Sequence, residues 1–309
     1  MNDLLAGRER ALRALELTVK RKLEGFLHGE ITGLRSGPGS EPNEARPYQA
    51  GQDDVRRMDW NVTARSLEPH VRAPLAEREL ETWALLDASA SMDFGTALSE
   101  KRDVAIAVVG AIGLLSDRPG NRLGVRIALG NDLRRLPAAG GAVQLRRTLR
   151  TLLSLPRATP GAFPRTDLGK AISRLDREHT RPGLRVIVSD FHEDGWADPL
   201  RRLAARHEVI AVEVLDPREL ELPEVGLLTL VDPETGRRRE IQTASRKLRR
   251  RYADAMAAHH EQTTQAIRSA GAAHLVLRTD TDWVRDVAAF TTARRRAGVR
   301  RNPNAVRTR

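Results

Sequence analysis

The chain has 309 residues, a length that fits one large α/β domain with an extension, or two small domains. Hydrophobic residues make up 40% of it, which is enough for a core, and the absence of cysteine excludes disulfides, cysteine zinc sites and thiol nucleophiles. The net charge of +11 lies mainly at one end, because residues 293–309 carry seven arginines and no acid, leaving +4 (11 − 7) on residues 1–292. The surplus predicts a basic disordered tail, and nucleic-acid binding through that tail stays open as an alternative function.

The N-terminal segment is charged and amphipathic. Apolar residues at helical spacing over residues 3–28 predict a long helix, and the charges along it are not typical of a signal peptide. The longest apolar stretch, residues 104–115, is shorter than the roughly 20 residues that a membrane helix needs. We therefore expect a cytoplasmic protein.

Residues 33–65 differ in composition from the rest of the chain. Glycine, proline and serine predict a loop at 33–43, whereas 48–65 (YQAGQDDVRRMDWNVTAR) is dense in acids and arginines around Trp60. Charge-assisted pairs can brace such a segment, with Trp60 anchoring it to the core. A partner-binding epitope is the alternative interpretation.

From residue 80 onward, apolar strands alternate with helices. We expect strands at 80–86, 122–129, 133–136, 184–189, 209–215 and 274–277, helices at 101–116, 142–154, 168–178, 199–207, 245–269 and 281–293, and a surface hairpin at 226–243. Such alternation predicts an α/β fold with a doubly wound, mostly parallel sheet flanked by helices. The predicted organisation is an N-terminal extension (1–79), this domain (80–292) and the tail (293–309).

Three oxygen-bearing side chains follow the first apolar strand: Asp87, Ser89 and Ser91. A carboxylate and two hydroxyls at this spacing form an all-oxygen ligand set, which hard divalent cations such as Mg²⁺ prefer. The same short pattern also occurs in turns and helix caps, so the triplet is significant only if further ligands follow.

Two further oxygen ligands do follow. Thr166 precedes the helix at 168–178, and Asp190 follows the apolar strand at 184–189. In parallel sheets, ligands bind at the carboxyl ends of the strands near the switch in strand order, so we expect Asp87 and Asp190 at the same edge. The five residues predict a site for Mg²⁺, with Mn²⁺ or Ca²⁺ as alternatives, and with at least one position open to water or a partner.

In this order the five residues match the metal-ion-dependent adhesion site (MIDAS) of the von Willebrand factor A domain, which the chain resembles. That motif is Asp-x-Ser-x-Ser, a distant threonine and a later aspartate. The resemblance implies that Ser89, Ser91 and Thr166 contact the metal directly or through water, and that Asp87 and Asp190 contribute directly or through intervening groups. It also implies a von Willebrand factor A-like fold and a partner carboxylate that completes the coordination.

A second resemblance covers residues 30–215. The chain is similar to domain of unknown function family 58, a bacterial family. The residues that match the family pattern are Tyr48, Gly51, Asp53, Asp54, Arg56, Asp59, Trp60, Ala64 and Arg65. The one departure is Gln52, between the glycine and the two acids. This resemblance implies that the protein acts together with a MoxR-type AAA+ ATPase in the chaperone-like assembly or maturation of client proteins. Some relatives carry N-terminal membrane segments, which this sequence lacks.

Catalytic motifs are missing from the sequence. It has no Gly-x-Ser-x-Gly elbow, no P-loop and no Gly-x-Gly-x-x-Gly. His192 would be the general base of an enzyme, and Asp93 and Glu193 could support the metal ligands, although solvated surface roles are the alternative for all three. We predict a non-enzymatic protein, with a metal-dependent hydrolase built on Asp87 and Asp190 as the less favoured alternative.

Overall fold

The computed structural model describes residues 45–49, 54–66, 68–72, 81–97, 99–116, 120–157 and 165–300. The chain divides into two compact units, Met1–Gly29 with Glu79–Phe290 and Glu30–Arg78 with Thr291–Arg309. The helix predicted at 3–28, the loop at 33–43 and the tail from residue 301 lie outside the described residues.

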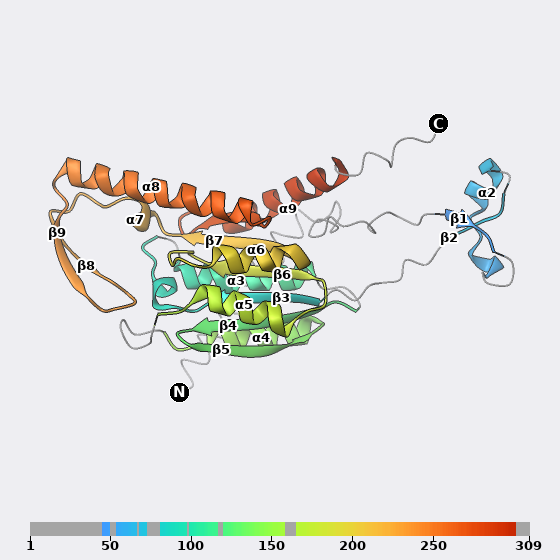
Figure 1. The fold of residues 1–309 in the computed structure, drawn as a ribbon, viewed down its shortest axis with the longest axis horizontal. Coiled ribbons are helices and arrows are strands. Elements are labelled where there is room, and N and C mark those ends of the chain that lie inside the picture. The colour runs from blue at the N-terminus through green and yellow to red at the C-terminus, as the bar shows by residue number, and fades with distance from the viewer. Residues whose placement is uncertain are drawn as a thin grey trace. The chain divides into compact units, whose positions relative to one another are not determined.

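The larger unit is built on a six-stranded sheet of order β10-β7-β6-β3-β4-β5 (Figure 1). All neighbouring strands pair in parallel except β4 and β5, which are antiparallel. The strands are β3 Glu81–Asp87, β4 Arg122–Leu129, β5 Asp132–Ala139, β6 Leu184–Ser189, β7 Glu208–Leu215 and β10 Ala273–Arg278. This topology confirms the predicted α/β fold with a mostly parallel sheet.

Helices cover both faces of the sheet. Helices α3 and α4 contact each other on one face, and α5 and α6 contact each other on the opposite face (Figure 1). The principal helices are α3 Lys101–Leu115, α4 Ala142–Leu153, α5 Leu168–Glu178, α6 Ala197–Arg206, α8 Arg246–Ser269 and α9 Trp283–Arg300, with short turns at η2 Ala90–Asp93 and α7 Pro217–Leu220. Helix α9 continues beyond its predicted end at residue 293. None of the described helices is long and apolar enough to cross a bilayer.

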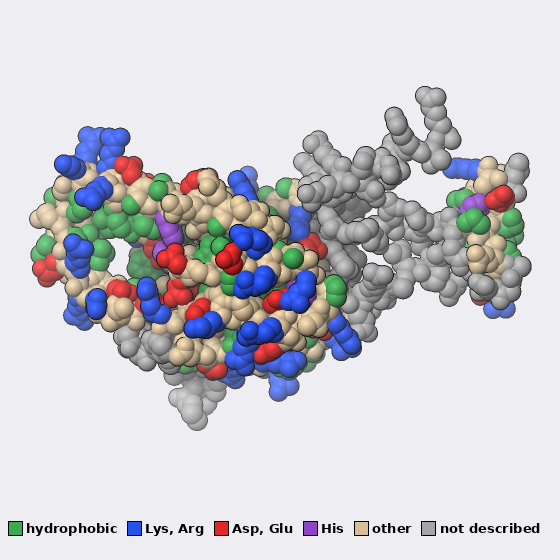
Figure 2. Space-filling model, viewed as in Figure 1, with side chains coloured by type: hydrophobic (Ala, Val, Ile, Leu, Met, Phe, Trp, Pro, Cys, Tyr) green, Lys and Arg blue, Asp and Glu red, His purple; other side chains and the backbone are tan. Residues whose placement is uncertain are grey.

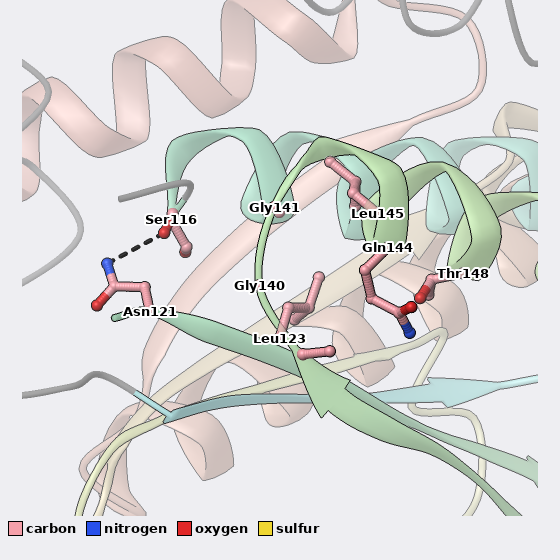
Figure 3. Close-up of a pocket in the computed structure, with 10 residues that line it drawn as sticks. Ser116, Asn121, Leu123, Gly140, Gly141, Gln144, Leu145 and Thr148 are labelled. Carbon is pink, nitrogen blue, oxygen red and sulfur yellow. Dashed lines mark hydrogen bonds between the residues drawn. The ribbon is translucent and has the colours of Figure 1, made fainter. Parts of the chain in front are cut away.

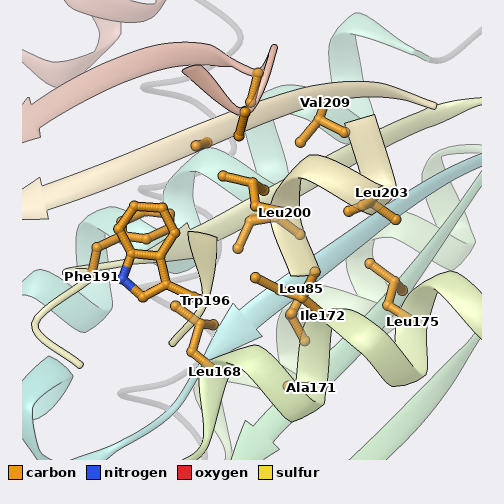
Figure 4. Close-up of a cluster of buried hydrophobic side chains, with 14 of the residues drawn as sticks. Leu85, Leu168, Ala171, Ile172, Leu175, Phe191, Trp196, Leu200, Leu203 and Val209 are labelled. Atoms are coloured by element: carbon orange, nitrogen blue, oxygen red, sulfur yellow. The ribbon is translucent and has the colours of Figure 1, made fainter. Parts of the chain in front are cut away.

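Strand β3 lies inside the sheet and is buried on both faces, as its apolar sequence predicts. Side chains alternate along a strand, so Leu85 faces the same side as Asp87. On that side Leu85 joins the core formed by the sheet, α5 and α6, which includes Ile172, Leu200 and Leu203 (Figure 4). The alternation therefore directs Asp87 towards the α5 side at the end of β3.

A small cavity lies at the other end of the sheet, between α3, α4 and the start of β4 (Figure 3). Its lining includes Asn121, Leu123 and Thr148, and Asn121 Nδ2 donates to the Ser116 carbonyl at 3.0 Å. The cavity has about 20 Å³ of room, which fits a single water. It is therefore too small for a metabolite.

A long hairpin follows β7. Strands β8 Leu227–Val231 and β9 Arg238–Gln242 pair in antiparallel fashion, which confirms the hairpin predicted at 226–243. Both strands are largely exposed.

The smaller unit pairs β1 Ala45–Pro47 with β2 His70–Arg72 and adds η1 Val55–Arg57 and α2 Trp60–Ser66. Two of its acids cap helices: Asp54 accepts from the Arg56 N–H at 3.0 Å, and Asp59 accepts from the Asn61 N–H at 3.1 Å. Trp60 is 69% exposed, so it is not buried within the smaller unit, and its anchoring to the core of the larger unit stays a prediction. It is the first residue of a seven-residue helix in which no residue is buried, so this helix provides no core for an indole.

Candidate metal centre at the strand ends

The switch in strand order lies between β3 and β6. These strands are neighbours, but β3 leads through α3 to β4 on one side, and β6 leads through α6 to β7 on the other. Such a divergence opens a crevice at the carboxyl ends of the strands. Asp87 is the last residue of β3, and Asp190 directly follows β6.

The strand register sets the first contacts in this crevice. Leu86 pairs with Val188, so the next residues along, Asp87 and Ser189, end their strands side by side. Ser189 Oγ donates to Asp87 Oδ2 at 2.6 Å, and the Ser89 N–H donates to Asp87 Oδ1 at 2.9 Å. Asp87 is buried, and these two bonds fix its carboxylate.

Ser89 and Ser91 flank the start of the 3-10 turn η2. Their hydroxyl oxygens lie 3.1 Å apart, close enough for a hydrogen bond. Ser89 is buried and Ser91 is half-buried. The turn thus brings both hydroxyls together next to the carboxylate that precedes them in sequence.

Thr166 reaches the site from the side of β4. The Gly130 N–H, in the turn after β4, donates to Thr166 Oγ1 at 2.9 Å. The loop after β3 is tied to the same strand, because the Ala88 N–H donates to the Ala128 carbonyl at 2.8 Å. Thr166 is buried, and it lies at the end of β4, the strand next to the one that carries Asp87.

The loop after β6 packs tightly against the start of α5. A Cβ at Gly169, in the first turn of α5, would lie 2.7 Å from the Gly195 carbonyl oxygen, so only glycine permits this approach. Phe191 has a left-handed φ of 54°, unusual for a bulky residue, and its N–H donates to Ser189 Oγ at 3.1 Å. Backbone strain of this kind often marks a functional turn, and here it lies directly after Asp190.

Asp190 already has a cationic partner. The fully buried Lys101 ammonium lies 2.8 Å from Asp190 Oδ2 and also pairs with Glu219. Burial would raise the pKa of Asp190, but the Lys101 charge outweighs it and holds that pKa well below its ordinary value. The His192 N–H donates to Asp190 Oδ1 at 3.3 Å. Because the Lys101 ammonium already neutralises Asp190, this residue is better placed to act through an intervening water than as a direct metal ligand.

The other carboxylates near this edge repel one another. Burial, and then the charge of Asp190, raise the pKa of Asp87 to about 6 against the hydrogen bonds from Ser189 and Ser89. Burial, and then the charge of Asp87, raise the pKa of Glu193 to about 7. A divalent cation would relieve this repulsion, so the charge distribution fits one.

The ligand chemistry fits a hard cation as well. Carboxylate and hydroxyl oxygens suit Mg²⁺, Mn²⁺ or Ca²⁺. Among the described residues, no group of three or more histidine, aspartate or glutamate side chains is arranged to hold a metal by itself. Any cation here therefore depends on the hydroxyls of Ser89, Ser91 and Thr166.

Asp93 and His192, which the sequence also places near the metal ligands, each pair with another side chain. Asp93 pairs with Arg102 at 2.8 Å. His192 Nδ1 lies 3.4 Å from Asp190 Oδ2; burial would lower the pKa of His192, but its hydrogen bond and charge interaction with Asp190 raise it. His192 is therefore placed to support Asp190.

Three residues of this site were not predicted from the sequence: Ser189, Lys101 and Glu234. Ser189 was detectable, since it ends an apolar strand one residue before Asp190. Lys101 and Glu234 carried no such signal, because their partners Asp190 and Ser91 lie 89 and 143 residues away along the chain.

Comparison with known families identifies the chain. A family model described as "Protein of unknown function DUF58" matches residues 44–262. The chain belongs to this family. The resemblance inferred from residues 48–65 and the strand-end motif is thereby confirmed.

Relatives of the chain include mycobacterial proteins. Uncharacterized protein Rv1480 of Mycobacterium tuberculosis is 52% identical over 290 residues, covering 94% of this chain and 90% of the relative. Uncharacterized protein MAV169 of Mycobacterium avium is 46% identical over 166 residues, covering 53% of this chain and 96% of the relative.

Solved structures with a similar arrangement are more distant. Conserved hypothetical protein BatB from Bacteroides thetaiotaomicron shares 13% identity, with 70% of this chain and 98% of that chain covered and a TM-score of 0.40. The SpRpn10 VWA domain shares 14% identity, with 67% and 93% covered and a TM-score of 0.36. No residue role in the DUF58 chain follows from these similarities.

Proposed function

We propose that this DUF58 protein is a non-enzymatic protein-interaction module that captures its partner through a divalent cation. Asp87, Ser89 and Ser91 would hold the cation, with Thr166 and Asp190 contributing directly or through water. The observation that supports this most is the position of Asp87: a buried carboxylate beside two converging hydroxyls, at the switch in strand order.

The cation would supply an electrophilic coordination position for an oxygen ligand from the partner. The chain's own residues keep that position geometrically defined. Ser189 and the Ser89 N–H fix the two oxygens of Asp87, and Lys101 keeps Asp190 ionised. Because these contacts are buried, Asp87 and Asp190 would keep their positions when a partner binds.

A carboxylate is the partner group that fits this chemistry best, as the resemblance to von Willebrand factor A domains implies. The family resemblance also points to a MoxR-type AAA+ ATPase, with client proteins as further partners in chaperone-like assembly or maturation. A hydrolase is less well supported, because the sequence carries none of the catalytic motifs named above and the candidate base His192 is already paired with Asp190.

The test is binding of a purified MoxR-type AAA+ ATPase from the same organism to the immobilised chain, in Mg²⁺ and in EDTA. Capture should require Mg²⁺ and should be lost in Asp87→Ala. Asp198→Ala, on the exposed N-terminal turn of α6, is the matched control and should bind like the wild type. Equal capture in EDTA, or by a folded Asp87→Ala protein, would contradict the proposed mechanism.

A further inference from the structure

The tip of the β8–β9 hairpin reaches the predicted metal site. Glu234 Oε1 accepts a hydrogen bond from the Ser91 N–H at 3.2 Å. Ser91 is one of the residues whose hydroxyl is a predicted ligand, so a carboxylate from a distant segment lies within one hydrogen bond of the ligand set.

The turn that carries Glu234 is well organised. Asp232 Oδ1 accepts from the Glu234 N–H at 2.9 Å, and Asp232 Oδ2 accepts from Thr235 Oγ1 at 2.6 Å. Gly236 closes the turn with a left-handed φ of 69°, a conformation that favours glycine, and its N–H donates to the Asp232 carbonyl at 2.8 Å. The local structure therefore presents Glu234 in a fixed orientation instead of leaving it on an irregular loop.

The hairpin is anchored firmly at its base. The buried Thr243 bonds through its Oγ1 to the Val225 N–H and the Gly226 carbonyl, and Arg249 donates to the Thr243 carbonyl at 2.6 Å.

Between base and tip, the strands are mostly exposed, including Leu227 at 65% and Val231 at 45%. Figure 2 shows an opening between this arm and the rest of the domain, with hydrophobic side chains around it. An arm with few buried contacts along its length is a segment of low local stability, so its tip can leave the site without unfolding the core.

Electrostatics alone do not explain the position of Glu234. It lies near the carboxylates of Asp190 and Glu193, and Arg165 is the opposing charge near both glutamates. A half-buried glutamate would be better solvated away from other carboxylates. Its position is consistent instead with a cation shared between the hairpin and the strand ends.

We propose that Glu234 is an internal ligand of the site, which takes the coordination position that a partner's carboxylate occupies when the partner binds. This inference rests on the proposed function and adds its regulation. The hairpin tip then competes with the partner, and partner binding requires Glu234 to leave the site. The chain in isolation would be in the closed state.

Mn²⁺ is the probe, since its paramagnetism reports both binding and the number of coordinated waters through proton relaxation. We compare wild type, Glu234→Gln, Glu234→Ala and the control Glu240→Gln, an exposed glutamate on β9 of the same hairpin. Both Glu234 variants should bind Mn²⁺ about tenfold more weakly, with about one more coordinated water. Added acetate should displace that water in the variants but not in the wild type.

The outcomes separate this inference from the proposed function. If Mn²⁺ binds the wild type and Asp87→Asn abolishes binding, but both Glu234 variants match Glu240→Gln in affinity and hydration, Glu234 is not a ligand and the proposed function stands. Tighter Mn²⁺ binding in the Glu234 variants would also overturn the inference. If the wild type does not bind Mn²⁺, both ideas fail together.

Discussion

Charged side chains are buried near both ends of strand β3, a cation at the amino end and mainly carboxylates at the carboxyl end. At the amino end, the fully buried Arg185 donates from its two terminal nitrogens to the backbone carbonyls of Glu81, Leu184, His179 and Arg181, at 2.8 to 3.1 Å. At the carboxyl end, Asp87 and its neighbouring carboxylates face hydroxyls, one another and a single buried ammonium, that of Lys101.

The comparison separates structural charge from functional charge. The two terminal nitrogens of Arg185 are satisfied by carbonyls in loops and strand ends, whereas its buried Nε has no hydrogen-bond partner. These four bonds stabilise the fold. The carboxylate end instead has raised pKa values at Asp87 and Glu193, caused by burial and by neighbouring acids. Perturbed carboxylates in a strand-end crevice are typical of a binding site.

The largest expected effect lies at the amino end. Arg185→Leu should lower the free energy of unfolding by roughly 4 kcal/mol, because it leaves several buried carbonyls without a donor. Chemical denaturation measures the loss, with Arg201→Leu, an exposed arginine on α6, as the control. Added Mg²⁺ should leave this loss unchanged, because it stabilises the wild type and the variant equally. A loss below about 1 kcal/mol would show that Arg185 is not a brace.

Lys101→Met should have the next largest effect. It should lower the free energy of unfolding by roughly 3 kcal/mol, because Asp190 and Glu219 lose their shared cation. Here Mg²⁺ should restore part of the stability, since a divalent cation can replace the missing charge. The exposed Lys170→Met is the matched control. If Mg²⁺ rescues neither Lys101→Met nor Arg185→Leu, the two ends of the strand do not differ in the way described.

A smaller effect concerns pH at the amino end. Burial, and then nearby arginines, lower the pKa of the buried His207 to about 4. The unfolded chain then binds more protons between pH 6.5 and 4, so this part of the stability is present above pH 6.5 and lost as the pH falls towards 4. His207→Leu should remove about 2 kcal/mol of that dependence, measured as unfolding free energy against pH. If the dependence of the unfolding free energy on pH is the same in His207→Leu and the wild type, the pKa of His207 is not lowered by folding.

Much of this arrangement follows from local sequence. Near-continuous apolar runs mark β3 and β6 because both are buried on two faces, and the acids that end them are placed by strand polarity alone. Lys101 was not predictable, because it lies in an apolar helix and its partner Asp190 is 89 residues away. The sequence also does not show that Trp60 is exposed within its own unit, since an aromatic residue gives no information about whether the surrounding fold can enclose it.

The central claim is that the carboxyl end of β3 holds a divalent cation on Asp87 and the neighbouring hydroxyls. Its most direct test is a Mn²⁺ titration followed by electron paramagnetic resonance, on wild type, Asp87→Asn and Asp198→Asn as the surface control. The account predicts one bound Mn²⁺ in the wild type and in the control, and at least a hundredfold weaker binding in Asp87→Asn with its fold retained. Equal binding by all three proteins, or none by the wild type, would contradict it.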